Sequence, residues 1–201
     1  MQIRFFVVIL QAKKEELMDD KKLHWKVLES EYLFREPWFT ARRDKVELPN
    51  GTVMPAYYVL EYPDWINTIA ITKDDKFVFV RQYRHALGSV NFELCAGVVD
   101  DTDENPMAAA KRELWEETGY GGGEWEEFMT ISANASAANN HTHCFIARGV
   151  EKIDEQHLEP TEMITVHLFT FDEVFNMLKN NKIQQATMLA PLWKFIAERM
   201  K

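Results

Sequence analysis

Short apolar runs that end at turn residues dominate the chain and predict β-strands. Residues 66–71 and 77–82 are almost continuously apolar and are joined by a turn at Asp74-Asp75, a pattern typical of neighbouring strands in a buried sheet. Residues 163–169 alternate apolar and polar side chains, as a half-buried strand does. We therefore expect one main β-sheet with the first two runs at its centre.

A second group of strands precedes this sheet. It comprises residues 25–30, 38–46 and 57–62. The second half of the chain adds strands at residues 127–133 and 143–147 and helices at residues 107–118, 171–179 and 186–200. Pro191 fits the last helix only at a kink or a restart. The expected fold is mixed α/β (α+β), with helices packed on a mixed sheet and a small antiparallel N-terminal β-module.

Composition and charge narrow the class of protein. The chain has 201 residues, 46% of them hydrophobic, which is enough to build a sizeable core. Its net charge of -9 argues against nonspecific nucleic-acid binding, which needs a basic surface. Cys95 and Cys144 are too few for a disulfide scaffold and lack zinc-type spacing, so we expect buried thiols in a reducing cytoplasm. No run approaches transmembrane length, so no membrane partner is expected.

The N-terminus carries a short apolar run at residues 5–10. No small-residue cleavage site follows this run and a charged segment comes next, so we do not expect export. Met18 offers an alternative translation start. We expect residues 1–17 to be an extension with little role in the fold, residues 18–64 to form the N-terminal strand module, and residues 65–201 to form the main domain.

Three glutamates crowd one side of the helix predicted at residues 107–118. At about 100° of rotation per residue, Glu113, Glu116 and Glu117 share an arc of about 100°. Hard carboxylate oxygens in such an arrangement collect Mg²⁺ or Mn²⁺, which in turn hold phosphate oxygens. A solvated helix face, with Arg112 paired to Glu116, has the same spacing and is the alternative.

The surrounding residues identify a motif. Gly97, Glu104, Arg112, Glu113, Leu114, Glu116, Glu117, Gly119 and Tyr120 together resemble the Nudix box, Gly-x5-Glu-x7-Arg-Glu-U-x-Glu-Glu-x-Gly-U, where U is bulky and apolar. The resemblance implies a Nudix-type mixed β-sheet sandwiched between helices. It also implies Mg²⁺, with Mn²⁺ as an alternative, held by the last three glutamates of the box and by the carbonyl of Ala96.

One departure from the motif falls in the loop before the helix. Six residues separate Gly97 from Glu104, where the family has five. Asp103 stands at the five-residue spacing and can take the place of Glu104. The core of the box is intact, so we expect metal binding to survive while the loop bulges.

Two segments before the box are similar to the ADP-ribose pyrophosphatase branch of the family. They are Arg81-Gln82-Tyr83-Arg84 and Glu93-Leu94-Cys95-Ala96-Gly97, with Cys95 in place of the usual proline. The likeness implies that Arg84, and Arg81 beside it, contact substrate and that Glu93 lies near the metals or the substrate. It also implies a homodimer formed through the N-terminal module. A surface ion pair at a strand end is the alternative for Arg84.

The remaining site candidates each have a structural alternative. The likeness places the general base on the loop at residues 155–162, where Glu162 fits best and Glu159 second, although both can be solvated acids and Glu113 or Glu116 of the box can also act. Trp38 can stack on a base or pack in a dimer, and Arg43 can approach phosphate or blunt an exposed strand edge. Asn134 can line the substrate site or belong to a polar turn.

The function implied is metal-dependent hydrolysis of a nucleoside diphosphate sugar, with ADP-ribose as the leading candidate, to a nucleoside monophosphate and a sugar phosphate. One alternative is a Nudix hydrolase of dinucleoside polyphosphates or nucleoside triphosphates. Another is a noncatalytic module that senses nucleotide sugars, which predicts a damaged box. The expected partners are a small-molecule substrate and a second copy of the chain.

Overall fold

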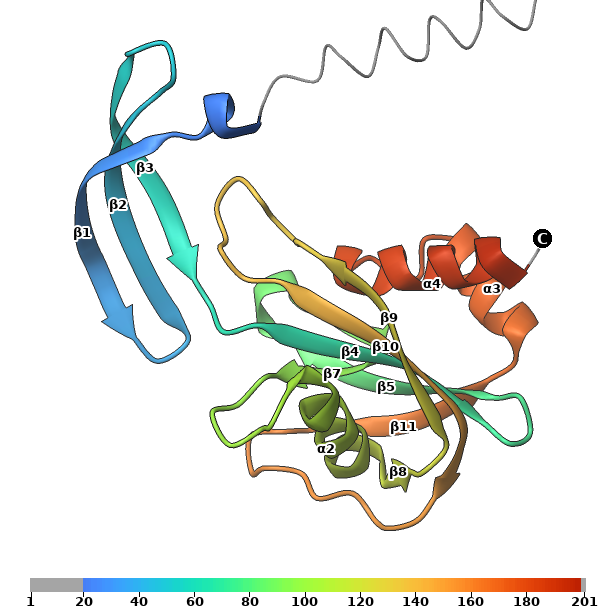
Figure 1. Cartoon of the computed structure of the whole chain (residues 1–201). Coiled ribbons are helices and arrows are strands. Elements are labelled where there is room, and N and C mark those ends of the chain that lie inside the picture. Colours follow the sequence, from blue (N-terminus) through green and yellow to red (C-terminus); the bar gives the residue numbers. More distant parts are fainter. Residues whose placement is uncertain (1–19, 200–201) are drawn as a thin grey trace, which may run out of the picture. The chain divides into compact units, whose positions relative to one another are not determined.

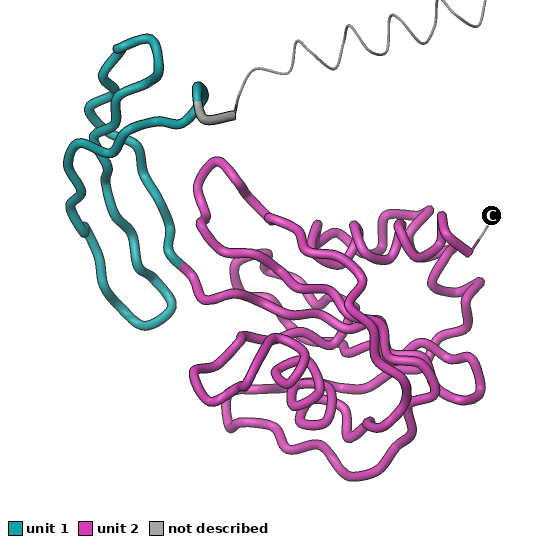
Figure 2. Tube along the Cα trace, in the orientation of Figure 1, with its two compact units in different colours: residues 1–61 teal, residues 62–201 magenta. Residues whose placement is uncertain are grey.

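The computed structural model describes residues 20–199, which fall into two compact units (Figure 2). The first unit is Met1–Glu61 and the second is Tyr62–Lys201. The extension expected at residues 1–17 lies outside the described residues. Within them, no helix is long and apolar enough to cross a membrane.

The first unit is a three-stranded antiparallel sheet, as the sequence predicts. A short 3-10 helix, η1 (Asp20–Leu23), precedes β1 (Lys26–Glu36), β2 (Phe39–Glu47) and β3 (Val53–Glu61). The strands lie in the order β1-β2-β3. The hairpin between β2 and β3 turns at Gly51, whose φ of 81° suits glycine. The side chain of buried Asp44 accepts hydrogen bonds from the side chains of Ser30 and Arg42, and the bond to Ser30 connects β2 to β1.

The second unit is built on an eight-stranded mixed sheet (Figure 1). Its strands are β4 (Trp65–Thr72), β5 (Phe77–Arg84), β6 (Ser89–Glu93), β7 (Cys95–Val98), β8 (Tyr120–Gly121), β9 (Glu124–Ile131), β10 (Thr142–Lys152) and β11 (Thr165–Phe169). The main path runs β11-β5-β4-β10-β8, while β6, β7 and β9 pair with β5, β4 and β10. The pair β4 and β10 is parallel and the others are antiparallel. The central position expected for β4 and β5 is confirmed.

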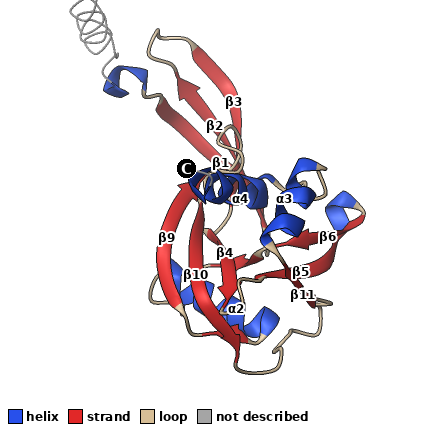
Figure 3. Cartoon of the chain, turned by 90° about the vertical axis from the view of Figure 1, so that its right-hand side faces the viewer, coloured by secondary structure: helices blue, strands red, loops and turns tan. Residues whose placement is uncertain are grey.

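Helices cover both faces of this sheet (Figure 3). On one face, α2 (Pro106–Thr118) packs against Ile66 and Ala70 of β4. On the other face, α3 (Phe171–Lys179) and α4 (Ala186–Arg199) pack against Ile69 and Ile71 of the same strand. Because successive side chains of a strand point to opposite faces, the continuous apolar run of β4 supplies both layers of the core. The expected α+β architecture is therefore confirmed.

Two details differ from the sequence analysis. The sequence analysis predicts no strand between residues 82 and 107, but β6 and β7 lie there. Both strands are short and include polar or glycine residues, so their local β-propensity is low. Pairing with β5 and β4 stabilises them. The last helix also runs through Pro191 without restarting. Proline removes the donor to the carbonyl four residues earlier, that of Thr187, and the side-chain amide of Asn67 donates to that carbonyl at 2.7 Å.

Candidate active site

Helix α2 begins and ends where the sequence predicts. The side chain of Asn105 accepts a hydrogen bond from the Ala108 N–H at 3.0 Å, and Pro106 is the first helical residue. Gly119, with φ of 69°, ends the helix. Buried Leu114 and its neighbours fix one face of α2 on the sheet, so that its acidic face meets β7.

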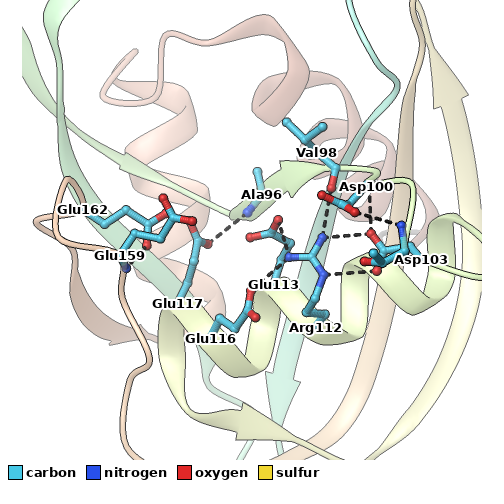
Figure 4. Close-up of polar contacts among 11 residues, drawn as sticks. Ala96, Val98, Asp100, Asp103, Arg112, Glu113, Glu116, Glu117, Glu159 and Glu162 are labelled. Carbon is cyan, nitrogen blue, oxygen red and sulfur yellow. Dashed lines mark hydrogen bonds and ion pairs between the residues drawn. The ribbon is translucent and has the colours of Figure 1, made fainter. Parts of the chain in front are cut away.

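The acidic face of α2 lies directly on the backbone of β7. Glu117 is 4% exposed and its Oε2 accepts a hydrogen bond from the Ala96 N–H at 3.2 Å (Figure 4). At Gly97, a Cβ atom would overlap the side chain of Glu113. The glycine of the box thus allows this close approach, and a larger residue would displace the Glu113 side chain.

Burial changes the ionisation of these carboxyl groups. It raises the pKa of Glu117 to about 8, and it also raises the pKa of Glu113. A buried carboxylate is costly unless a cation or hydrogen bonds compensate its charge. Buried carboxylate oxygens, which require a compensating positive charge, are suitable ligands for a hard divalent cation.

Arg112 supplies the positive charge that the cluster has at present. Its Nη1 donates to Glu113 and Glu116, both at 2.9 Å. Among residues 20–199, no three acidic, histidine or cysteine side chains already converge as ligands for a single ion. Each of these two acids bonds Arg112 through one carboxylate oxygen only, Oε1 of Glu113 and Oε2 of Glu116.

The inserted residue of the loop changes which acid holds Arg112. Asp103 accepts from Arg112 through both oxygens, at 3.1 and 2.9 Å, and the Val98 carbonyl accepts from the same guanidinium at 3.1 Å. The Asp103 hydrogen bonds are the main cause of the raised pKa of Arg112. Glu104 is exposed. Asp103 thus takes the position that the motif gives to Glu104.

Arg84 and Glu93 form a second ion pair near the cluster. The guanidinium meets the carboxylate through two nitrogens, with Nε–Oε1 at 2.9 Å and Nη2–Oε2 at 2.6 Å. Arg84 is the last residue of β5 and its side chain is 38% exposed, whereas that of Glu93 is 1% exposed, so the ion pair at a strand end is present and one partner is buried. Hydrogen bonding to Glu93 raises the pKa of Arg84.

A cavity of about 480 Å³ adjoins these groups. Its lining includes Trp65, Asn67, Arg84, Ala96, Thr142 and Gln185. Strand β7 therefore contacts the carboxylates of α2 at Gly97 and contributes Ala96 to the cavity wall. The size is that of a small-molecule site.

The loop between β10 and β11 is fixed to the C-terminal end of α2. The Gln156 side chain donates to the Glu117 carbonyl at 2.6 Å, and the His157 N–H donates to the Glu116 carbonyl at 2.8 Å. The charge of Glu162 contributes to the raised pKa of both Glu113 and Glu117, and Figure 4 shows its carboxylate beside the cluster.

Glu159 lies in the same turn of this loop, and it is exposed. Its backbone N–H donates to the Glu162 carboxylate at 2.9 Å. The geometry therefore favours Glu162 over Glu159 as a proton acceptor, and gives Glu159 a contact that orients Glu162.

The other candidates are not among the residues that line the cavity. Trp38, which is 76% exposed, and Arg43, which pairs with Glu31, belong to the first unit. The Arg81 guanidinium lies 5.6 Å from the Phe92 ring centre. Asn134 accepts from the Ser136 hydroxyl at 2.8 Å within a turn.

Sequence reasoning missed three polar residues of the cavity wall, Asn67, Thr142 and Gln185. They lie far apart along the chain and match no local motif. Only the pairing of β4 with β10 and the start of α4 bring them together.

The Asp103 contact gives a testable prediction for stability. Asp103→Ala should lower the free energy of unfolding by about 1–3 kcal/mol, because Arg112 loses two charge-assisted hydrogen bonds in a partly buried site. Glu104→Ala is the matched control and should change it by less than about 0.5 kcal/mol. Urea denaturation measures both. Equal losses, or a larger loss for Glu104→Ala, would contradict the assignment.

Comparison with known proteins shows which domain families the chain matches. The NUDIX domain family matches residues 65–192, and the nucleoside diphosphate sugar hydrolase N-terminal domain matches residues 25–60. A solved structure described as an ADP compounds hydrolase superposes with a TM-score of 0.76 over 88% of this chain and 94% of its own. Its sequence identity is 21%, so this likeness shows the fold alone.

Characterised relatives agree with the domain match. The methanol dehydrogenase activator of Bacillus methanolicus is 30% identical over 88% of this chain and 95% of its own length. The ADP-ribose pyrophosphatase of Bacillus subtilis strain 168 is 26% identical, covering 83% and 89%. That of Mycobacterium tuberculosis is 28% identical, covering 69% and 68%. The box glutamates lie against β7, and the NUDIX domain match covers more than half of the chain. This chain therefore belongs to the Nudix hydrolase family.

Proposed function

We propose that this protein is a metal-dependent pyrophosphatase that hydrolyses the diphosphate bond of a nucleoside diphosphate sugar, with ADP-ribose as the leading substrate. The products would be AMP and ribose 5-phosphate. The observation that carries the proposal is the burial of Glu117 and Glu113 against β7, next to a cavity that also holds Arg84. Two relatives named ADP-ribose pyrophosphatase support the choice of substrate.

The cation would be Mg²⁺, with Mn²⁺ as the alternative, since Nudix hydrolases generally use divalent metal ions. Glu113, Glu116, Glu117 and the Ala96 carbonyl would hold it. When bound, the ion neutralises phosphate charge and acidifies the attacking water. The raised pKa of Glu117 means that this carboxyl group must lose a proton to become a ligand, so binding should release protons near neutral pH.

Two side chains would act on the substrate directly. Arg84 bonds Glu93 through Nε and Nη2, which leaves Nη1 to donate to a diphosphate oxygen. Glu162 would accept the proton of the attacking water, because its carboxylate lies beside the cluster and the Gln156 contact holds its loop. The intact set of box glutamates argues against a noncatalytic sensing role.

The first unit supports a homodimer. Every residue of β1 is exposed, and large apolar side chains, among them Val27, Tyr32 and Phe34, are 42–55% exposed. Exposed apolar surface of this kind marks interaction sites. A second copy of the chain is the partner we propose. We also place the enzyme in the cytoplasm, since Cys95 and Cys144 are both free and buried.

A substrate panel tests the proposed activity. ADP-ribose, other nucleotide sugars, dinucleoside polyphosphates and nucleoside triphosphates would be incubated with Mg²⁺ or Mn²⁺, and each product identified by chromatography. We expect AMP and ribose 5-phosphate from ADP-ribose, and no reaction in a metal chelator. Preference for triphosphates or dinucleoside polyphosphates would move the protein to another Nudix class. Failure to cleave any diphosphate would reject the enzymatic proposal.

The role of Glu162 has its own test. Glu162→Gln should lower kcat by about 100-fold or more while Mn²⁺ affinity stays unchanged, because the amide cannot accept a proton. Glu159→Gln is the matched control from the same turn, and its backbone contact to Glu162 would remain, so turnover should stay within about threefold of wild type. Steady-state kinetics and Mn²⁺ titration measure the two quantities. Unchanged turnover in Glu162→Gln would remove this residue from the mechanism.

A further inference from the structure

Three buried polar atoms at the cavity have no hydrogen-bond partner within residues 20–199. They are Asn67 Oδ1, Thr142 Oγ1 and Gln185 Oε1. Asn67 is 0% exposed and Thr142 is 2% exposed, and all three residues line the cavity of about 480 Å³. Buried polar atoms without partners are costly, so their concentration at one cavity indicates a ligand that completes them.

The orientation of the Asn67 amide is determined by its surroundings. Its Nδ2 donates at 2.7 Å to the Thr187 carbonyl, which Pro191 leaves without a helical donor. This hydrogen bond fixes the orientation of the amide, because a flipped amide would place its oxygen against the Thr187 carbonyl oxygen. The amide oxygen is therefore the atom left for a ligand.

The fold brings these groups to one place. In the parallel pair of β4 and β10, Thr142 lies opposite Trp65 and Cys144 lies opposite Asn67, so Thr142 and Asn67 project on the same face. Gln185 stands at the start of α4, where its carbonyl accepts the N–H groups of Met188 and Leu189. The three groups are thus placed by two strands and by the start of one helix, which are rigid supports for recognition.

The rest of the lining defines the chemistry of the ligand group. Ile66, Leu87 and Met188 contribute apolar surface, and the charge of Arg84 is already paired with Glu93. No carboxylate lines the cavity, so a cationic group would find no partner there. The amide oxygens of Asn67 and Gln185 call for an uncharged group that carries O–H or N–H donors, and the Thr142 hydroxyl can donate to or accept from the same group.

We propose that Asn67, Thr142 and Gln185 form a specificity pocket for the uncharged, hydrogen-bond-donating part of the substrate next to the diphosphate. Ribose hydroxyls and a base amino group share this chemistry. The inference rests on the proposed function, because the pocket adjoins Ala96 and Arg84, which we assign to the cation and the diphosphate. Substrates without such donors at this position would leave the Asn67 and Gln185 oxygens unpaired and would bind more weakly.

The test uses one substitution at the cavity and one away from it. Thr142→Val keeps the shape of the side chain and removes the hydroxyl. Thr68→Val is the matched control, because Thr68 Oγ1 is also buried and unpartnered but Thr68 does not line the cavity. Thr142→Ser, which keeps the hydroxyl, shows whether any loss comes from that group. Calorimetric titration with AMP, IMP and ribose 5-phosphate measures Kd without turnover.

We expect Thr142→Val to weaken binding by about threefold to tenfold, the loss of one neutral hydrogen bond, while its Tm equals or exceeds that of wild type. Thr68→Val and Thr142→Ser should keep wild-type affinity. Weaker binding of all three probes would assign the pocket to ribose hydroxyls, and weaker binding of AMP alone would assign it to the adenine amino group.

Unchanged affinity of Thr142→Val for every probe, or an equal loss in Thr68→Val, would overturn the pocket. The same holds if wild-type protein binds none of the probes. These results do not depend on catalysis, so failure of the pocket is distinguishable from failure of the proposed hydrolysis, which the substrate panel reports.

Discussion

The close approach of α2 to β7 at Gly97 is the constraint on which the rest of the site depends. Because position 97 has no side chain, the Glu113 carboxylate lies against the strand, and Glu117 reaches the Ala96 N–H one residue away. The same strand contributes Ala96 and Val98 to the cavity. A single four-residue strand, Cys95–Val98, therefore contacts both the acidic cluster and the cavity and fixes their relative positions.

Electrostatic balance accounts for a second feature of this geometry, the guanidinium between the acids. Three carboxylates on one arc of a helix repel one another, and Arg112 offsets that repulsion by bonding Glu113 and Glu116. Asp103 and the Val98 carbonyl hold Arg112 in place. A bound cation would add positive charge beside the same acids.

Local sequence signals predicted much of this arrangement. The helix predicted at residues 107–118 and its glutamate arc depend on residues within a few positions of one another, and the structure has a helix at Pro106–Thr118. Strand β7 and the cavity wall could not be predicted in this way. Asn67, for example, meets Thr187 across 120 positions, and that contact explains how α4 accommodates Pro191. Long-range contacts of this kind have no signature in a single sequence.

The central claim, that Gly97 allows the glutamates to gather as a cation site, is tested most directly by Mn²⁺ titration monitored by electron paramagnetic resonance. Wild-type protein and Gly97→Ala would be compared, with circular dichroism as a check on folding. We predict that wild type binds Mn²⁺ and that Gly97→Ala, although folded, binds it at least about tenfold more weakly, because the new methyl group displaces Glu113. Equal affinity in the two folded proteins would contradict the claim.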